Sequence, residues 1–394
     1  MELHPAVQKL ATAAARHRQT LHRIPEICFT EYKTQAYLLR RLQACAPDRL
    51  ETLAQTGVKA VYLADNPRGT LAFRSDTDGL AIEEETGAPY ASRHAGYMHG
   101  CGHDGHMTML LLLARLICSC RDTLRYNVVL LFQPAEEGQG GAREMIREGA
   151  LTNPDVDCIY GMHLWPNVPR GRIGVRWGPM MAQTAEFDVI VHGKSAHGAS
   201  PQMGVDAIVA AAELIGLIQT AISRHIDPHQ DALLTIGKIQ GGTARNIIAD
   251  RVELNATLRV FNGDVYESLM TRLHAMLRGL EVATGAHFEF QPRMQYPCVD
   301  NPRQLVEAFY VHMDPAELYL CDPVMAAEDF AFYQEQVPGL YLFLGIQGGR
   351  NAYPLHNSRF DFDEELLLNG VEVYRRILGL CERSASAAQA KPAL

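Results

Sequence analysis

The chain has 394 residues, of which 47% are hydrophobic and 21% charged, so it has enough apolar material for a core and enough length for two domains. Its formal net charge of -9 excludes a broad nucleic-acid-binding surface, which requires clustered Lys and Arg. The strongest apolar run, Met107 to Cys118, is too short to span a bilayer and contains Arg115. Because the N-terminus also lacks the apolar stretch of a signal peptide, we expect a soluble, cytoplasmic protein without membrane or nucleic-acid partners.

The nine cysteines do not indicate a disulfide framework or a zinc ribbon, because the chain is long and contains no CxxC pair. We interpret eight of them as small apolar residues, buried or half-buried. These eight are Cys28, Cys45, Cys118, Cys120, Cys158, Cys298, Cys321 and Cys381. Cys101 is set apart by its histidine and glycine neighbours.

In chain order, the first half of the sequence alternates helices with apolar strands. The expected helices cover residues 5–22, 31–44 and 104–119, and the expected strands cover 69–75, 127–132 and 157–164. A short continuous apolar run is typical of a strand covered on both faces. The alternation therefore predicts a largely parallel sheet with helices on both sides, the αβα sandwich of an α/β protein.

The pattern changes near Gly178. The elements expected after it are strand 184–192, helix 205–222, strands 232–239 and 251–261, helix 265–284 and strand 287–291. This β-α-β-β-α-β order is that of a ferredoxin-like α+β domain. Helix 303–312, strand 340–344 and helix 363–380 then resume the α/β pattern.

We therefore expect a catalytic domain of residues 1–179 and 293–394, with a second domain of residues 180–292 inserted into it. An exposed strand edge on the inserted domain could pair with a second copy, so a homodimer or larger homo-oligomer is left open.

Polar segments follow the expected strands of the first half, and sites in open α/β sheets form where the carboxyl ends of strands meet. In the segment MHGCGHDGH, residues 98–106, Cys101 and His103 cannot share one face of a helix, but in a loop they can point the same way. A thiolate and an imidazole both suit a borderline metal such as zinc. The alternative is a helix N-terminus in which Asp104 favours the helix dipole and the histidines are incidental.

Three other candidate ligands have ordinary interpretations when taken alone. Glu136 and Glu137 follow an apolar strand, and an isolated acidic pair is more often a solvated turn than a metal site. His163 ends an expected strand, where a histidine is more often part of the core. His356 lies in a loop before the last helix and by itself indicates little.

Together, these residues predict a two-metal site. Cys101, His103, Glu137, His163 and His356 are five ligands, and one catalytic zinc usually takes three protein ligands and a water. Two ions about 3.5–4 Å apart that share one ligand account for all five. A mixed sulfur, nitrogen and oxygen site accepts Zn, Mn, Co or Ni, of which we favour Zn or Mn.

The ordered motifs resemble the M20 metallopeptidase superfamily, in particular its subgroup of aminoacylases, hippurate hydrolases and plant auxin-conjugate hydrolases. The resemblance extends from HRIPE at 22–26 to the last helix, through RSDTDGL at 74–80, MHGCGHDGH at 98–106, QPAEEG at 133–138, GMH at 161–163, GKSAHGA at 193–199, GGTARN at 241–246, EDF at 328–330 and LHN at 355–357. The chain departs from the usual motifs at Gly79-Leu80-Ala81, where Ala-Leu-Pro is common, and at Ala249, where Pro is common. These departures affect substrate choice more than chemistry.

The resemblance implies a role for each candidate residue. The five ligands would hold two divalent ions with Cys101 bridging them, and Glu136 would be the general base. His197 of the inserted domain would stabilise the oxyanion, often in the active site of a partner subunit, while Asn246 and Arg259 would bind substrate. Asp76 and Asp78 either support a metal-bound histidine or form a turn, and we favour the supporting role for Asp76.

The expected reaction is hydrolysis of the amide bond of an N-acyl amino acid, of the hippurate or N-acetyl type. A metal-bound water would attack the carbonyl, with Glu136 moving its proton to the leaving amine. The inserted domain would act as a lid that brings His197 to the site. Two alternatives remain: a dipeptidase or aminopeptidase, in which Asp usually replaces Cys101, and a catalytically silent ligand-binding relative, which has no need to retain Glu136.

Overall fold

The computed structural model describes residues 1–350 and 353–381, which form two compact units. The first unit comprises residues 1–180, 300–322 and the described residues from 329 onward. The second comprises residues 181–299 and 323–328. It therefore includes residues 181–292 of the range expected for the inserted domain, and residues 293–299 and 323–328 in addition.

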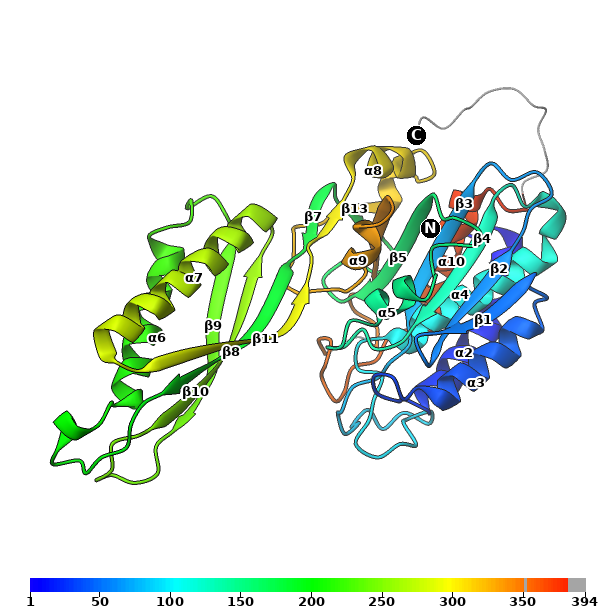
Figure 1. Cartoon of the computed structure of the whole chain (residues 1–394). Helices are drawn as coiled ribbons and strands as arrows, with labels where there is room; N and C mark the ends of the chain where they lie inside the picture. Colours follow the sequence, from blue (N-terminus) through cyan, green and yellow to red (C-terminus); the bar gives the residue numbers. More distant parts are fainter. Residues whose placement is uncertain (351–352, 382–394) are drawn as a thin grey trace. The chain divides into compact units, whose positions relative to one another are not determined.

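The first unit is built on an eight-stranded mixed sheet, whose strand order is β1-β2-β4-β3-β5-β14-β6-β13 (Figure 1). Its four central strands, β4, β3, β5 and β14, are parallel, whereas β1, β2 and β6 each pair antiparallel with a neighbour. The prediction of a largely parallel sheet therefore holds for the centre and for the β6–β13 pair, whereas the β1–β2, β2–β4 and β14–β6 pairs are antiparallel. The strands are β1 (Arg49–Leu53), β2 (Gly57–Tyr62), β3 (Thr70–Asp76), β4 (Asn127–Gln133), β5 (Cys158–Trp165), β6 (Ile173–Val175), β13 (Leu318–Leu320) and β14 (Gly339–Gly345).

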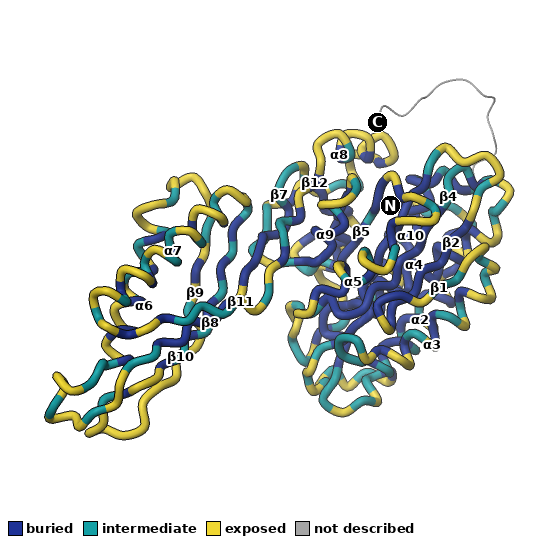
Figure 2. The backbone as a smooth tube through the Cα atoms, in the orientation of Figure 1, coloured by how far each residue is buried: buried dark blue, intermediate teal, exposed yellow. Residues whose placement is uncertain are grey.

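Helix α4 (His103–Ser119) is the central helix of the first unit and is buried along most of its length (Figure 2). It packs against the sheet and against α2 (Ala11–His22), α3 (Tyr32–Gln43) and α10 (Leu367–Leu378), which explains why it is apolar on nearly all sides. The remaining helices of this unit are α1 (Pro5–Gln8), α5 (Gly141–Arg147), α8 (Arg303–Tyr310) and α9 (Ala331–Gln334), with 3-10 turns η1 (Arg121–Thr123), η3 (Pro315–Glu317) and η4 (Glu364–Leu366).

The single helix expected at residues 5–22 is wrong, because the chain breaks into α1 and α2. The Leu10 N–H donates to the carbonyl of Val7, three residues back, instead of four. This tighter turn interrupts the α-helical hydrogen bonds at Leu10.

The second unit is a four-stranded antiparallel sheet of order β11-β8-β10-β9 with two helices packed on it (Figure 1). Its element order is the predicted β-α-β-β-α-β. Buried residues alternate along β10, because every second side chain contacts the helices. The elements are β8 (Gln183–His192), η2 (Pro201–Met203), α6 (Ala207–Ser223), β9 (Ala232–Gly241), β10 (Arg251–Val260), α7 (Gly263–Thr284) and β11 (His287–Tyr296), and β7 (Gly178–Met181) pairs with β12 (Val299–Asn301).

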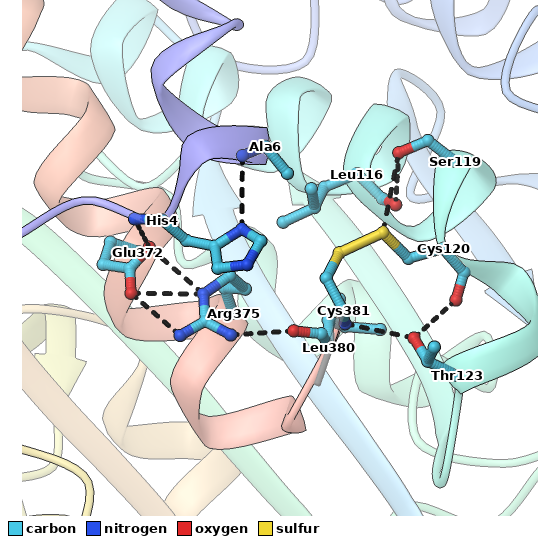
Figure 3. The surroundings of a disulfide bond; sticks show 10 residues. All are labelled: His4, Ala6, Leu116, Ser119, Cys120, Thr123, Glu372, Arg375, Leu380 and Cys381. Carbon is cyan, nitrogen blue, oxygen red and sulfur yellow. Dashed lines mark hydrogen bonds and ion pairs between the residues drawn. A yellow bond between two sulfur atoms is a disulfide. The ribbon is translucent and has the colours of Figure 1, made fainter. Parts of the chain in front are cut away.

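A disulfide joins Cys120 to Cys381 (Figure 3). The interpretation of these two residues as free apolar cysteines is therefore wrong, and Cys118, expected to be at least half-buried, is exposed. Cys120 follows α4 and Cys381 follows α10, and the packing of these helices brings the two Cα atoms within 5.6 Å. Among the described residues, no helix combines the length and apolarity needed to cross a membrane.

Candidate metal centre

The five predicted ligands all belong to the first unit and come from segments at the ends of its central strands. Cys101 and His103 lie at the start of α4, and Glu137 follows β4. His163 lies near the end of β5, and His356 lies in the loop that follows β14. Parallel neighbours place their carboxyl ends at one edge of a sheet, which brings these distant segments together.

The start of α4 is held in place by a left-handed glycine and a buried ion pair. Gly102 has φ +86°, a conformation that turns the chain between Cys101 and His103 at little cost for glycine. Asp104 accepts hydrogen bonds from Arg18 Nε at 2.9 Å and from His22 Nδ1 at 2.7 Å, and all three side chains are buried. Arg18 and His22 belong to α2 and Asp104 to α4, so this contact joins the two helices. Separating them would leave an uncompensated buried charge, which is costly.

The side chains of the five residues form two groups that share Cys101. In the first, Cys101 Sγ lies 3.4 Å from His163 Nε2, and His103 completes the group. In the second, His356 Nε2 lies 3.3 Å from Cys101 Sγ and 3.2 Å from Glu137 Oε1. The structure therefore brings all five predicted ligands into one cluster.

The donor set fits two divalent ions. Ligands at about 2.0–2.3 Å from a tetrahedral ion lie about 3.3–3.8 Å from one another, and the three distances at Cys101 and His356 are close to this range. The Nε2 atom of His103 is buried and has no hydrogen-bond partner among the described residues. A buried polar atom without a partner is costly, and a cation would supply one.

The orientation of two histidines also suits metal binding. The Nδ1–H of His103 donates to the carbonyl of Asp78 at 2.9 Å, and that of His163 donates to the carbonyl of Leu164 at 2.7 Å. Each contact fixes the proton on Nδ1 and leaves a lone pair on Nε2, which faces the cluster. The positive φ of His356, +63°, is a further constraint at this site, since non-glycine residues rarely adopt it.

The shortest histidine contact of Asp76 is to His106, which is not one of the five predicted ligands, and the Asp76 carboxylate lies 3.8 Å from His103 Nε2. Its carboxylate accepts from His106 Nδ1 at 2.7 Å, and His106 Nε2 accepts the N–H of Leu164 at 3.0 Å. Both nitrogens of His106 are thus engaged in hydrogen bonds, so we assign it no ligand role, although it forms with Asp76 and His103 another group of close metal-ligating atoms. Asp78 instead contacts His103, and its other oxygen accepts the Glu137 N–H at 2.9 Å. Sequence reasoning named the pair but could not assign the two contacts.

The pKa shifts show that the cluster carries an excess of negative charge. Burial raises the pKa of Cys101 well above its usual value, and the carboxylates of Glu137 and Glu136 raise it further. Burial lowers the pKa of His103, but the carboxylates of Asp76 and Asp78 outweigh this and raise it to about 10. A bound dication would reverse both effects, stabilising a thiolate and a neutral imidazole.

The other three predicted residues lie in the second unit, where the loops of His197 and Asn246 meet, whereas Arg259 lies toward the opposite end of β10 and does not join them. His197 is exposed, and its Nδ1 accepts the N–H of Ala199 at 3.1 Å, so Nε2 carries the proton. The N–H of Gly198 donates to the carbonyl of Asn246 at 2.8 Å, which joins the two motif loops. Arg259 is half-buried in β10, and burial lowers its pKa.

Sequence reasoning missed Glu31 altogether and gave Asp329 no role. Glu31 accepts the N–H of Ala135 in the loop that carries Glu136, and Asp329 accepts the N–H of Ala142 at the start of α5, so the two buried carboxylates hold the loop and the helix that follows it. The only sequence signal for either residue was an acidic side chain beside an expected helix or strand. That signal is weak without knowledge of which backbone group lies nearby.

Comparison with known families gives one match that covers most of the chain. Residues 72–379 match the model of peptidase family M20/M25/M40. This range includes all five residues of the cluster and extends through the whole second unit.

Individual relatives are similar over nearly their whole length. An N-acetyldiaminopimelate deacetylase of Bacillus pumilus is 37% identical, covering 90% of this chain and 94% of its own, and one of Exiguobacterium sibiricum is 38% identical over 90% and 95%. A solved structure from Bacillus subtilis, described as a dinuclear metal-binding peptidase of the M20 family, has a TM-score of 0.81 at 30% identity and covers 95% of this chain and 99% of its own. A structure from methicillin-resistant Staphylococcus aureus has a TM-score of 0.89, also at 30% identity, and covers 94% and 97%.

Proposed function

Because the chain belongs to peptidase family M20/M25/M40 and is an amidohydrolase of that family, we propose that it removes the acyl group from a small N-acyl amino acid. The observation that carries the proposal is the pair of ligand groups that share Cys101, beside the Glu136 carboxylate. The relatives named as N-acetyldiaminopimelate deacetylases favour an acetylated amino acid over a peptide.

We assign the ligand roles to Cys101, His103, Glu137, His163 and His356, with Cys101 shared between two ions. When bound, the ions would polarise the scissile carbonyl and lower the pKa of water. The carbonyl of Asp78 accepts the Nδ1–H of His103 and so orients that ring. The Asp78 carboxylate accepts the N–H of Glu137 and so holds the loop after β4. Zn and Mn suit this mixed donor set, and Co and Ni remain alternatives.

Glu136 is the proposed general base. Its Oε2 lies 4.0 Å from His103 Nε2, at the edge of the cluster, where a carboxylate can take the proton of an attacking water. The same carboxyl group then gives that proton to the leaving nitrogen. Glu136 is buried, which excludes bulk water from the proton transfer.

The second unit supplies the remaining proposed roles, those of a lid and a dimerisation domain. Asn246 and Arg259 would contact the substrate carboxylate or amide. The edge strand β9 exposes Leu233 and Ile239, and α6 exposes Ile208, which supports pairing with a second copy through this unit. A cytoplasmic location belongs to this proposal, although a disulfide such as Cys120–Cys381 is more common in oxidising compartments.

His197→Ala is expected to lower kcat about 10²–10³-fold, the usual cost of losing one oxyanion donor. Because the side chain is exposed, the melting temperature should stay unchanged. Mixing His197→Ala with Glu136→Ala subunits tests where the imidazole acts: recovered activity would place it in a partner's site within a dimer. An unchanged kcat for His197→Ala would remove this residue from the mechanism.

A substrate panel tests the proposed function itself. We expect protein loaded separately with Zn, Mn, Co or Ni to hydrolyse N-acetyl amino acids, including N-acetyldiaminopimelate, with a kcat/KM roughly tenfold or more above that for dipeptides. Hippurate measures tolerance of a larger acyl group. Faster cleavage of dipeptides would favour the peptidase alternative. No hydrolysis of any acylated amino acid by the metal-loaded protein would favour a silent ligand-binding role.

A further inference from the structure

The loop that carries Glu136, residues 133–141 between β4 and α5, is held in one unusual backbone shape. Ala135 has φ +56°, in the left-handed region that non-glycine residues seldom adopt. The carbonyl of Ala135 accepts the N–H of Gly141 at 3.0 Å, and a Cβ on Gly141 would lie 1.8 Å from the Pro134 oxygen. A strained alanine of this kind persists only where the surrounding structure holds it.

The contact that holds it comes from Glu31, which is fully buried and lies immediately before α3. Its Oε1 accepts the Ala135 N–H at 3.1 Å, and its Oε2 accepts the hydroxyl of Thr56 at 2.5 Å. Burying a carboxyl group is unfavourable unless hydrogen bonds compensate for the lost water. The hydrogen bonds from Thr56 and Ala135 both compensate the Glu31 carboxyl group, and the one from Ala135 comes from the strained residue.

The other side of Glu136 is held in the same way. Asp78, also buried, accepts the Glu137 N–H at 2.9 Å. The backbone N–H groups before and after Glu136 are therefore both bound by buried carboxyl groups from distant segments. Such a pair of anchors limits rotation of the peptide units that set the direction of the Glu136 side chain.

We propose that Glu31 is a positioning residue: it holds Ala135 in the left-handed conformation and thereby aims the Glu136 carboxylate at the metal cluster. This inference rests on the proposed function, in which Glu136 moves the proton. Glu31 itself contacts neither the cluster nor the substrate. Its loss therefore acts on the geometry of proton transfer and leaves the ligand set intact.

Hydrogen exchange and steady-state kinetics of Glu31→Ala, in the full-length metal-loaded protein, test this role. We expect amide exchange in residues 134–141 to become roughly tenfold faster or more, because the Ala135 N–H loses its acceptor. The value of kcat should fall roughly 10- to 100-fold, since a small displacement of a catalytic group has that effect, while KM stays within about twofold. Metal content should remain that of the unsubstituted protein.

Matched variants separate positioning from general stability. Glu31→Gln keeps an oxygen that accepts the Ala135 N–H and should restore most of kcat. Glu372→Ala removes an equally buried carboxylate that binds Arg375 (Figure 3) and also Arg376 in α10. It should lower the melting temperature without changing loop exchange or kcat. Ala135→Gly in the Glu31→Ala background should recover part of kcat, because glycine adopts positive φ without strain.

The proposal is overturned if Glu31→Ala has the same loop exchange and the same kcat as the unsubstituted protein. It is also overturned if adding Ala135→Gly to Glu31→Ala recovers no activity. If Glu31→Ala does not fold, Thr56→Val is measured instead: faster exchange at the loop supports the role of Glu31, and unchanged exchange overturns it. The exchange data are independent of catalysis. Full activity of a Glu136→Ala variant would therefore refute the proposed function while the contact of Glu31 with the loop is still tested.

Discussion

Glu136→Gln is expected to lower kcat about 10²–10⁴-fold, the usual contribution of a positioned general base. Glutamine keeps the shape of the side chain but cannot take a proton from water. The substitution should leave the metal content at two ions per chain, because neither of the two ligand groups that share Cys101 contains Glu136. The measurements are steady-state hydrolysis of an N-acetyl amino acid and metal analysis of the same samples.

The matched control is Glu144→Gln, on the neighbouring helix α5, where the side chain pairs with Arg147 at the surface. We expect its kcat to equal that of the unsubstituted protein. Loss of an ion in Glu136→Gln would identify Glu136 as a ligand instead of a base, since it also lies within reach of His103 and Glu137. Unchanged turnover in Glu136→Gln would refute the mechanism.

Cys101→Ala should weaken binding of both ions, because the sulfur belongs to both ligand groups. Loss of a residue that only supports a ligand costs about 10–100-fold in affinity, and removal of a shared ligand should exceed this. Titration with a competing chelator would measure the loss, and hydrolysis should fall in parallel. Cys158→Ala is the control, because Cys158 is also a free cysteine with 7% of its surface exposed but belongs to none of the described ligand groups.

Cys101→Asp extends the test, since a carboxylate can also bridge two ions. We expect it to regain much of the metal affinity that Cys101→Ala loses. Two ions bound by Cys101→Ala with unaltered affinity would show that the sulfur is not shared. In that case the five residues would have to be divided differently between the ions.

The central features of the first unit could be predicted because their signals are local. Helix α4 and strands β4 and β5 are continuous apolar segments, and Cys101 and Glu137 flank such segments. Strands β1 and β2 were missed because each is short and neither is a continuous apolar run; the edge strand β1 is also largely exposed or half-buried, whereas β2 lies inside the sheet and is buried. Edge strands carry less apolar pattern since they bury less surface.

Contacts between distant residues account for most of what could not be predicted. Which of Asp76 and Asp78 forms a hydrogen bond with His103 depends on the packing of the β3 end against α4, and the two positions differ by only two residues. Glu31 meets Ala135 across 104 residues, and the sequence contains no local trace of that contact. Residue type and strand ends predicted the ligand cluster, whereas its supporting hydrogen bonds required the fold.

The Cys120–Cys381 bond closes a covalent ring through 261 positions of the chain, and the whole second unit lies within that ring. A protease that cuts an exposed loop such as η2 would therefore produce a nicked molecule whose two pieces stay linked. On a denaturing gel the nicked protein would migrate as one band until a thiol reagent is added, and as two fragments afterwards.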